Sequence, residues 1–307
     1  MTQALVGAVV VAYRSALLIR ECLEGILADP RVECVVVDNS RDSETANIVA
    51  MLTDTSNGRV TYVDPGANLG YSRACNLGVR HMPSDVDFVA IINPDVKLEV
   101  KLSQVLTASG MPPDWTIVSG CLATEGESTG CGNARPLVTI GREVAKSVRG
   151  SAAYRQTEHV ALGGYLPVGQ LAGALLVLRT KDWLVLGGFD EQFELYYEDV
   201  DLCARANALS GCWLVGQRWG SHVGGASFSS SRGRAFIALR VSRVRYLRKW
   251  FGVKGVTAAP LIAALEWAAR TLGRCPESAS DRAAALRATV DEIAHPESVV
   301  VLEGGCR

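Results

Sequence analysis

The first hundred residues alternate between two hydrophobic patterns. Short apolar runs rich in β-branched residues occur at residues 6–12, 34–37, 60–63 and 88–92. Such runs are typical of strands that are covered on both faces. Between them, helical periodicity is found at residues 17–27, 43–52 and 72–81. This alternation predicts an α/β fold with a mixed, mostly parallel sheet flanked by helices.

The rest of the chain carries a less regular pattern. Residues 110–170 are rich in Gly, Ser, Thr and Pro, which predicts a loop-rich insertion. Further strands are expected at residues 170–179 and 214–215, and helices at residues 236–251, 258–272 and 281–294. We therefore expect a domain over residues 1–230, divided near residue 110, with a helical region over residues 231–307 packed on it.

Composition narrows the class of protein. A net charge of −1 gives no general reason to expect nucleic-acid binding. The nine cysteines include no Cys-x-x-Cys pair, and Cys22, Cys75 and Cys203 lie in apolar patterns, so we expect free thiols and a reducing cytoplasm. The start of the chain lacks a basic region and reads as a buried strand, and no window of about 20 apolar residues could span a bilayer. Any membrane contact is expected to be peripheral.

Polar residues follow each of the four predicted parallel strands. The strand ends read Ala12-Tyr13-Arg14, Asp38-Asn39, Asn68-Leu-Gly70 and Asn93-Pro-Asp95. Such residues form turns or bind ligands, and in an open sheet the carboxyl ends of the strands meet at one crevice. A carboxylate such as Asp38 can accept the imide N–H of a pyrimidine. Backbone N–H groups near Gly70 and the side chain of Arg73 suit a diphosphate, and Asp95 suits a divalent cation.

A second concentration of polar residues lies between Gly187 and Arg205, where six carboxylates accompany aromatic residues. Crowded carboxylates can supply a general base, a cradle for hydroxyl groups or metal ligands. In a helix, Glu198, Asp201 and Arg205 share a face, so that Arg205 can pair with Asp201. Asp199 points about 100° away and is free of that arginine.

The order of these motifs resembles the family 2 glycosyltransferases of GT-A fold, especially their rhamnosyltransferase-like branch. The resemblance covers about residues 5–251. It rests on Val9-Val-Ala-Tyr-Arg14, Val36-Val-Asp-Asn-Ser40, Asn68-Leu-Gly-Tyr-Ser-Arg-Ala-Cys-Asn76, Asn93-Pro-Asp95, Gly187-Gly-Phe-Asp-Glu191, Tyr197-Glu-Asp-Val-Asp-Leu-Cys-Ala-Arg205, His222-Val-Gly-Gly-Ala-Ser227 and Tyr246-Leu-Arg-Lys-Trp250.

The resemblance implies an inverting transfer of a sugar from a UDP- or dTDP-sugar, with a deoxyhexose such as rhamnose as the leading donor sugar. Asp199 is the implied general base, with Glu198 beside it, and Asp95 and His222 are implied ligands of Mg²⁺ or Mn²⁺. The metal-binding Asp-x-Asp motif reads Asn93-Pro-Asp95 here. The implied nucleotide-sugar site contains Ala12, Tyr13, Arg14, Asp38, Asn68, Gly70, Arg73, Asn76, Asn93 and Asp95. Asp190, Glu191 and Tyr197 are the implied acceptor residues, and residues 111–230 form the acceptor half.

Three questions stay open at this point. The acceptor is a small molecule, a glycan or a polyprenyl-linked sugar. The arginines of residues 232–249 either contact an anionic membrane or point to solvent from a helix packed by its apolar stripe. The Ala-rich helices after Ala258 offer a contact surface for a homo-oligomer. Rival functions are a catalytically weak binding module for glycans or sugar nucleotides, and a pyrophosphorylase, which the absence of a glycine-rich loop after the first strand disfavours.

Overall fold

The computed structural model describes residues 4–108, 110–124, 131–149, 160–223, 232–272 and 279–295. The chain divides into two compact units. The first comprises Met1–Leu137, Gln156–Glu191 and Glu198–Ser227, and the second comprises Val138–Arg155, Gln192–Tyr197 and Phe228–Arg307. Two segments of the second unit thus fall inside the range expected for the first. The domain boundaries expected from the sequence stay a prediction.

The first unit is built on a mixed sheet. Among the described residues this sheet has nine strands, in the order β3-β2-β1-β4-β10-β6-β11-β5, with β8 beside β11. One half is parallel and consists of β1 (Val6–Ala12), β2 (Val32–Asp38), β3 (Val60–Val63) and β4 (Phe88–Ile92). The predicted α/β fold is therefore confirmed, and the expected strand ends lie along one edge of the parallel half.

The other half of the sheet is mixed. Its strands are β5 (Val96–Leu98), β6 (Ile117–Thr124), β8 (Tyr165–Val168), β10 (Leu175–Arg179) and β11 (Cys212–His222). β10 runs antiparallel to both β4 and β6, while β11 is parallel to β6. A separate two-stranded sheet pairs β7 (Ala134–Arg135) with β9 (Gln170–Leu171).

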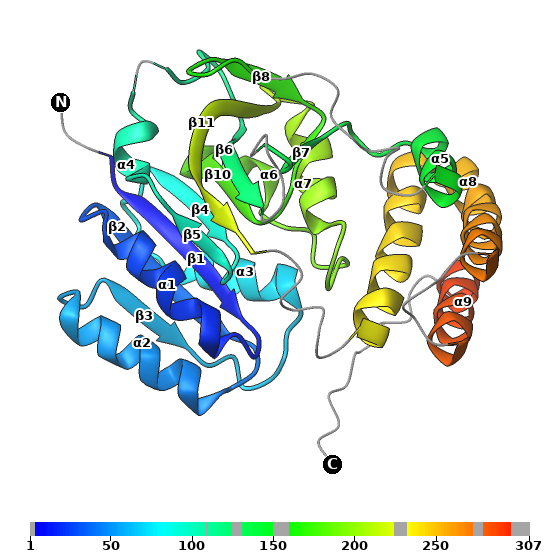
Figure 1. The fold of residues 1–307 in the computed structure, drawn as a ribbon, viewed down its shortest axis with the longest axis horizontal. Helices are drawn as coiled ribbons and strands as arrows, with labels where there is room; N and C mark the ends of the chain where they lie inside the picture. The colour runs from blue at the N-terminus through cyan, green and yellow to red at the C-terminus, as the bar shows by residue number, and fades with distance from the viewer. Residues whose placement is uncertain are drawn as a thin grey trace. The chain divides into compact units, whose positions relative to one another are not determined.

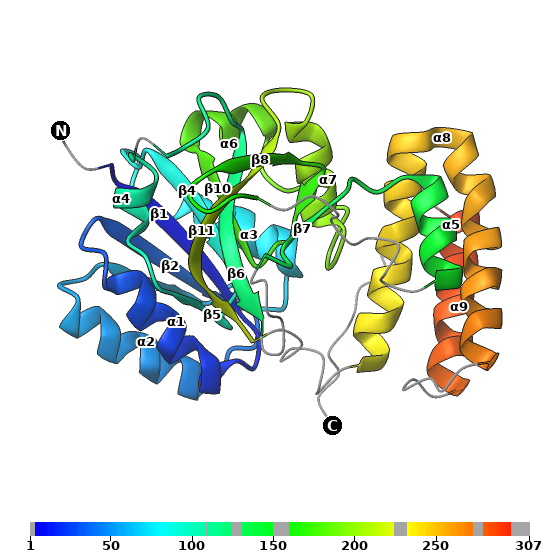
Figure 2. The ribbon, with the colours of Figure 1, turned by 45° about the horizontal axis from the view of Figure 1, so that its top comes forward.

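Helices cover both faces of the sheet because β1 is apolar on both faces. Val6, Ala8 and Val10 join the core under α1 (Ala16–Leu27) and α2 (Ser43–Thr55), which lie side by side over β1 to β3 in Figure 1. Val9 and Val11 join the opposite core with α3, α6 and α7. These three helices are Tyr71–Arg80, Thr180–Leu186 and Glu198–Ala206, and the one-turn helix α4 is Leu102–Val105. Figure 2 shows the same layers from a second side.

The expected loop-rich character of residues 110–170 is wrong for much of the described part. β6 is an inner strand of the sheet, although Ser119 and Gly120 interrupt its apolar pattern. A Cβ atom added at Gly120 would lie only 2.1 Å from Cγ of Trp219 in β11. The glycine is therefore needed for the close packing of a distant tryptophan, and it does not mark a loop.

The second unit is helical in its described part. It contains α5 (Ile140–Arg149), α8 (Arg232–Leu272) and α9 (Ala279–Ala294), with a core that includes Val244, Leu247 and Ile262. The predicted helices are present, but the first two run on as α8 through a bend at Gly252, whose φ is +54°. Glycine tolerates this left-handed conformation, which allows the chain to reverse direction.

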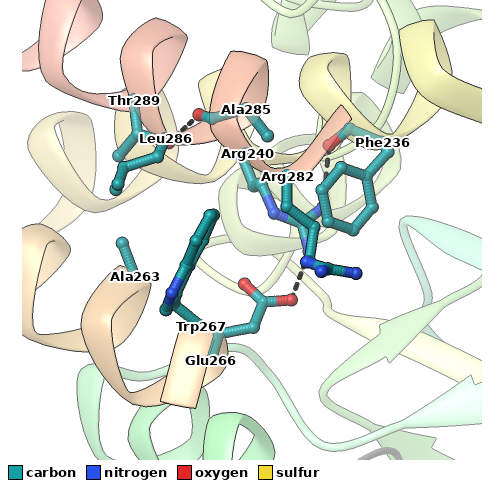
Figure 3. Close-up of a pocket in the computed structure, with 9 residues that line it drawn as sticks. All are labelled: Phe236, Arg240, Ala263, Glu266, Trp267, Arg282, Ala285, Leu286 and Thr289. Carbon is teal, nitrogen blue, oxygen red and sulfur yellow. Dashed lines mark hydrogen bonds and ion pairs between the residues drawn. The ribbon is translucent and has the colours of Figure 1, made fainter. Parts of the chain in front are cut away.

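Four arginines of α8 form ion pairs inside the helical unit, so the expectation that its arginines point to solvent is wrong for these four. Arg243 lies 3.1 Å from Glu266, and Glu266 also pairs with Arg240 in the hollow drawn in Figure 3. Arg245 and Arg248 approach the fully buried Glu292 at 3.0 and 2.8 Å. The charges of these four arginines are neutralised within the unit, and peripheral membrane contact of the chain stays a prediction.

Two further expectations concern cysteines and the membrane. Cys22, Cys75 and Cys203 are buried free thiols, as predicted. Cys121 and Cys131, however, form a disulfide between β6 and the residues before β7, which departs from the expected set of reduced thiols. Within the described residues, no helix has the length and apolar character required to cross a bilayer.

Candidate active site

Asn39 joins the loops at the carboxyl ends of β1, β2 and β3. Its backbone N–H donates to Ala12 O at 2.8 Å, and its side-chain Nδ2 donates to Gly70 O at 3.0 Å. Its Oδ1 accepts from Leu69 N at 3.3 Å. One buried amide therefore holds the loop before α3 against the end of β2, so that the predicted residues of these loops come together.

Asp38 is fully buried and organises the loop that follows it. Its carboxylate accepts five hydrogen bonds, from the backbone N–H groups of Ser40, Arg41 and Asp42 and from the hydroxyls of Ser40 and Tyr62. Burial, followed by the hydrogen bond to Asp38, raises the pKa of Tyr62 to about 12. The expected contact of Asp38 with a pyrimidine stays a prediction.

The start of α3 connects this region to the loop after β4. Gly70 precedes the helix with φ of +78°, a conformation that side chains other than glycine's disfavour. The Tyr71 hydroxyl donates to Asn93 Oδ1 at 2.8 Å. The amide of the Asn93-Pro-Asp95 motif is therefore held by α3.

The side chains of Arg73 and Asn76 in α3 face the loop after α6. Asn76 Nδ2 donates to Phe189 O at 2.9 Å and to Glu191 Oε1 at 3.1 Å, and Asn76 Oδ1 accepts from Phe189 N at 3.0 Å. Arg73 forms a half-exposed ion pair with Glu191 at 3.5 Å. In this structure both residues position the loop expected to bind the acceptor, and their place in the nucleotide-sugar site stays a prediction.

Two backbone hydrogen bonds lead from the loop after β4 to Asp199. Asn93 N donates to Ala174 O at 2.9 Å, and the adjacent Gly173 N donates to Asp199 Oδ2 at 2.8 Å. A Cβ atom at residue 173 would lie 3.3 Å from Asp199 Cβ, so the glycine permits this close approach. Asp199 and the Asn93-Pro-Asp95 loop therefore lie on the same edge of the sheet, although about a hundred residues separate them in sequence.

Two backbone N–H groups stabilise the ionised form of the Asp199 carboxylate. Its Oδ1 accepts from Val200 N at 2.8 Å, so that each carboxylate oxygen has a backbone donor. Burial raises the pKa of Asp199, whereas these two N–H groups and the nearby Arg135 of β7 act to lower it. Opposing effects thus act on the pKa of Asp199, and its carboxylate is held in one orientation. A general base requires both a suitable pKa and a fixed position.

Glu198 occupies a different environment from its neighbour. It is 6% exposed, and its Oε2 is one of the buried oxygens that have no hydrogen-bond partner among the described residues. Burial, followed by the charge of Asp199, raises its pKa well above the ordinary range for a glutamate. Asp201, in the same helix, pairs with Arg205 at 2.8 Å as predicted, and this pair is structural.

Asp95 directly precedes β5, and it lies beside His222 at the end of the neighbouring strand β11. The antiparallel register of β5 and β11 pairs Val96 with His222, and His222 Nε2 lies 3.2 Å from Asp95 Oδ1. Val223 N also donates to Asp95 O at 3.2 Å. One carboxylate and one imidazole thus converge, with Asp95 mostly buried. The described residues hold no group of three or more His, Cys, Asp or Glu side chains suited to a metal.

Comparisons with known proteins agree with this arrangement. The profile of glycosyl transferase family 2 matches residues 8–109. Residues 8–109 thus carry a glycosyl transferase family 2 domain. The low-salt glycan biosynthesis hexosyltransferase Agl10 of Haloferax volcanii is 26% identical over 176 residues, which is 57% of this chain and 53% of that protein. The N-acetylglucosaminyl-diphospho-decaprenol L-rhamnosyltransferase of Mycobacterium tuberculosis is 30% identical over 173 residues, 50% of this chain and 55% of that protein.

The matched regions span about half the length of these curated relatives. Among solved structures, the mannosyltransferase PcManGT from Pyrobaculum calidifontis, in complex with GDP-Man and Mn²⁺, superposes with a TM-score of 0.57. It is 17% identical, and the superposition covers 97% of this chain and 89% of that one. GalNAc-T7, with UDP, GalNAc and Mn²⁺, gives a TM-score of 0.58 at 13% identity, covering 95% and 57%. These likenesses show the GT-A fold.

The remaining predicted site residues of the first unit differ in their exposure to solvent. Ala12 is buried at the end of β1, and Arg14 is exposed beside the ring of Tyr13. Asn68 is exposed, and its Oδ1 accepts from Gly70 N. Asp190 is partly buried in the loop after α6.

Tyr197 belongs to the helical unit. It is buried there, and its hydroxyl donates to Glu143 Oε1 at 3.0 Å. Its contact with an acceptor stays a prediction. Residues 224–227 of the histidine motif lie outside the described residues.

Several residues that shape the site had no individual signal in the sequence. Tyr71 and Gly173 form hydrogen bonds with Asn93 and Asp199, and Arg135 acts on Asp199 through its charge, so each depends on a partner from another part of the chain. The clearest hint was Gly173, because a glycine directly before a buried apolar strand indicates close approach of another group.

Proposed function

We propose that this protein is an inverting glycosyltransferase. It would move a sugar, with a deoxyhexose such as rhamnose as the leading candidate, from a dTDP- or UDP-sugar to a hydroxyl acceptor. The observation that supports this most is the hydrogen-bonded connection from Asn93 through Ala174 and Gly173 to Asp199. It brings a poised carboxylate to the sheet edge that carries Asp95, within a family 2 domain of GT-A fold.

The proposed reaction is a single displacement. The acceptor oxygen forms a bond to the anomeric carbon, the bond from this carbon to the diphosphate oxygen breaks, and the hydroxyl proton passes to Asp199. A positioned general base contributes roughly 10²–10⁴-fold to such a rate. The N–H groups of Gly173 and Val200 support this role because they orient both oxygens of the carboxylate.

Asp95 and His222 fit a divalent cation. A carboxylate and an imidazole are ordinary ligands of Mn²⁺, and Mg²⁺ needs only one or two protein carboxylates when phosphates complete its shell. When bound, the cation would neutralise the charge that develops on the leaving diphosphate. The backbone N–H groups at the start of α3 are proposed to contact the same phosphates.

The acceptor is proposed by analogy with the relatives. One curated relative is named as acting on a diphospho-decaprenol compound, so a polyprenyl-linked sugar is our first candidate. Recognition of a uracil or thymine base is assigned to the loops around Asp38, since both bases present the same imide edge.

Calorimetry tests the donor site. UDP and dTDP are titrated into the protein with and without Mn²⁺, and binding of at least one of them, tightened by the metal, is expected. Incubation with labelled dTDP-rhamnose and a lipid extract should then give a labelled product. Absence of binding by both nucleotides would contradict the proposal, and donor binding without turnover of any acceptor would favour a binding module.

A further inference from the structure

Glu198 is a buried acid without a compensating partner in the described part of the chain. It opens α7, is 6% exposed, and its Oε2 receives no hydrogen bond from the described residues. An ionised carboxylate in such a position loses its hydration without gaining a replacement, which is costly. A neutral carboxylic acid bears a much smaller penalty in the same place.

Among the described residues, the groups that interact with Glu198 include no cation. Asp199, its neighbour in α7, adds a negative charge. From α3, the side chains of Tyr71 and Cys75 interact electrostatically with Glu198, and both are neutral at ordinary pH. By contrast, Asp199 has two N–H donors, and it has Arg135 of β7 nearby. The surroundings of Asp199 therefore favour an ionised carboxylate, whereas those of Glu198 favour a neutral carboxylic acid.

We propose that Glu198 keeps its proton during catalysis while Asp199 alone is ionised, so that Glu198 is a positioning residue that limits the base to one negative charge. This inference rests on the proposed function. Loss of the Glu198 proton at alkaline pH places a second buried charge beside the base. The carboxylates then repel each other and displace Asp199 from its two backbone donors.

The proton affinities of the two groups agree with the geometry. Burial and then the charge of Asp199 raise the pKa of Glu198 well above its usual range. Burial also raises the pKa of Asp199, but Gly173 N–H, Val200 N–H and Arg135 oppose that rise. The pair titrates as a unit, with Asp199 the first to lose its proton as pH increases. We therefore expect a bell-shaped profile of kcat/KM against pH.

The activity test compares Glu198→Gln with Asp199→Asn. Glutamine is a neutral replacement of the same shape, so Glu198→Gln should lower kcat at neutral pH far less than Asp199→Asn does. It should also lose the alkaline limb of the profile. Asp199→Asn should lose roughly 10²–10⁴-fold. A Glu198→Gln loss as large as that of Asp199→Asn, or an unchanged alkaline limb, would overturn the proposal.

A second test needs no substrate, and its outcome is therefore separate from that of the proposed function. The pKa of Glu198 is raised in the folded state, so its stabilising contribution is complete below the ordinary pKa of an unfolded glutamate and is lost as pH rises through the folded pKa. Urea midpoints are measured between pH 5 and pH 8. The midpoint of Glu198→Gln should rise relative to wild type as pH increases.

An equal difference at every pH would overturn the proposal. Should Glu198→Gln fail to fold, the Asp199→Asn variant supplies the same test. Removal of the Asp199 charge lets Glu198 ionise at lower pH, so this variant should lose less stability than wild type over the same range. A decline identical to that of wild type would contradict the proposed protonation of Glu198.

Discussion

Replacement of Asn76 by alanine should destabilise the protein and misplace the loop after α6. Asn76 is 8% exposed and makes three hydrogen bonds with that loop. Two of them satisfy the buried N–H and C=O groups of Phe189, and the third reaches the half-exposed Glu191. Each buried backbone group left without a partner costs about 1–3 kcal/mol. The loss at Glu191 adds little, so the expected destabilisation is about 2–6 kcal/mol.

Urea denaturation followed by circular dichroism measures this change, with Asn68→Ala as the matched control. Asn68 is exposed and its side chain accepts a single hydrogen bond from Gly70 N. Its replacement should therefore cost less than about 1 kcal/mol. A cost for Asn76→Ala no greater than that of the control would refute the assignment of Asn76 as the residue that fixes this loop.

The same variant separates two functions for Asn76. A positioning function predicts a raised KM for the acceptor and a UDP affinity within about 3-fold of wild type, since the lost bonds lie in the loop. A direct contact with the nucleotide-sugar predicts at least about a 10-fold loss of UDP affinity, equivalent to about 1.4 kcal/mol. Titration calorimetry with UDP decides between them.

Three further changes test other parts of the site. Gly173→Ala places Cβ 3.3 Å from Asp199 Cβ, and we expect kcat to fall by about 10–100-fold at unchanged UDP affinity, because a displaced base loses alignment; unchanged kcat would contradict this. Asp95→Ala should abolish the gain in UDP affinity that calorimetry detects on adding Mn²⁺, and a persisting gain would remove Asp95 from the metal site. Arg205→Met removes the arginine that pairs with the buried Asp201, and urea midpoints should report a loss of about 3–5 kcal/mol; a loss below about 1 kcal/mol would show that the pair is not structural.

The parallel half of the sheet was predictable because its signal is local. Its strands are continuous apolar runs between helices, and each helix follows its strand directly. β6 was not predictable in this way. Gly120 reads as a loop residue until Trp219, which comes about a hundred residues later, fills the space above it. The reason for a glycine in this strand is its packing against Trp219, which neither segment reveals by itself.

In the candidate site, too, local features were predictable and contacts between distant residues were not. The sequence indicated that Asp38, Asn93 and Asp95 follow strands, and the structure places their loops on one edge. It did not indicate which polar atoms are already engaged within the protein. Asp38 accepts five internal hydrogen bonds, and Asn76 uses its amide on Phe189 and Glu191. Motifs identify the loop that carries a residue, whereas the partner depends on tertiary packing.

The predicted solvent exposure of four arginines in α8 was wrong for a related reason. A basic stripe beside apolar residues resembles a membrane-binding helix, because the pattern describes only one helix. The compensating carboxylates of Glu143, Glu266 and Glu292 lie in α5, in the second part of α8 and in α9. Each is well separated in sequence from the arginine it neutralises. Burial of these charges could therefore not be inferred from the periodicity of residues 232–249.

The balance of buried charge separates structural carboxylates from functional ones within a single helix. In α7, Asp201 is fully buried but has Arg205 at 2.8 Å, and the glutamates of the helical unit have arginines in the same way. Among the described residues, neither Glu198 nor Asp199 forms an ion pair. The charge of Arg135 acts on Asp199 from a longer distance. The other buried carboxylates have either an arginine or, like Asp38, several hydrogen-bond donors, so leaving Oε2 of Glu198 without a partner adds nothing to stability. The unequal surroundings of Glu198 and Asp199 support the proposed chemistry, which needs one proton acceptor and a neutral neighbour at the edge of the sheet.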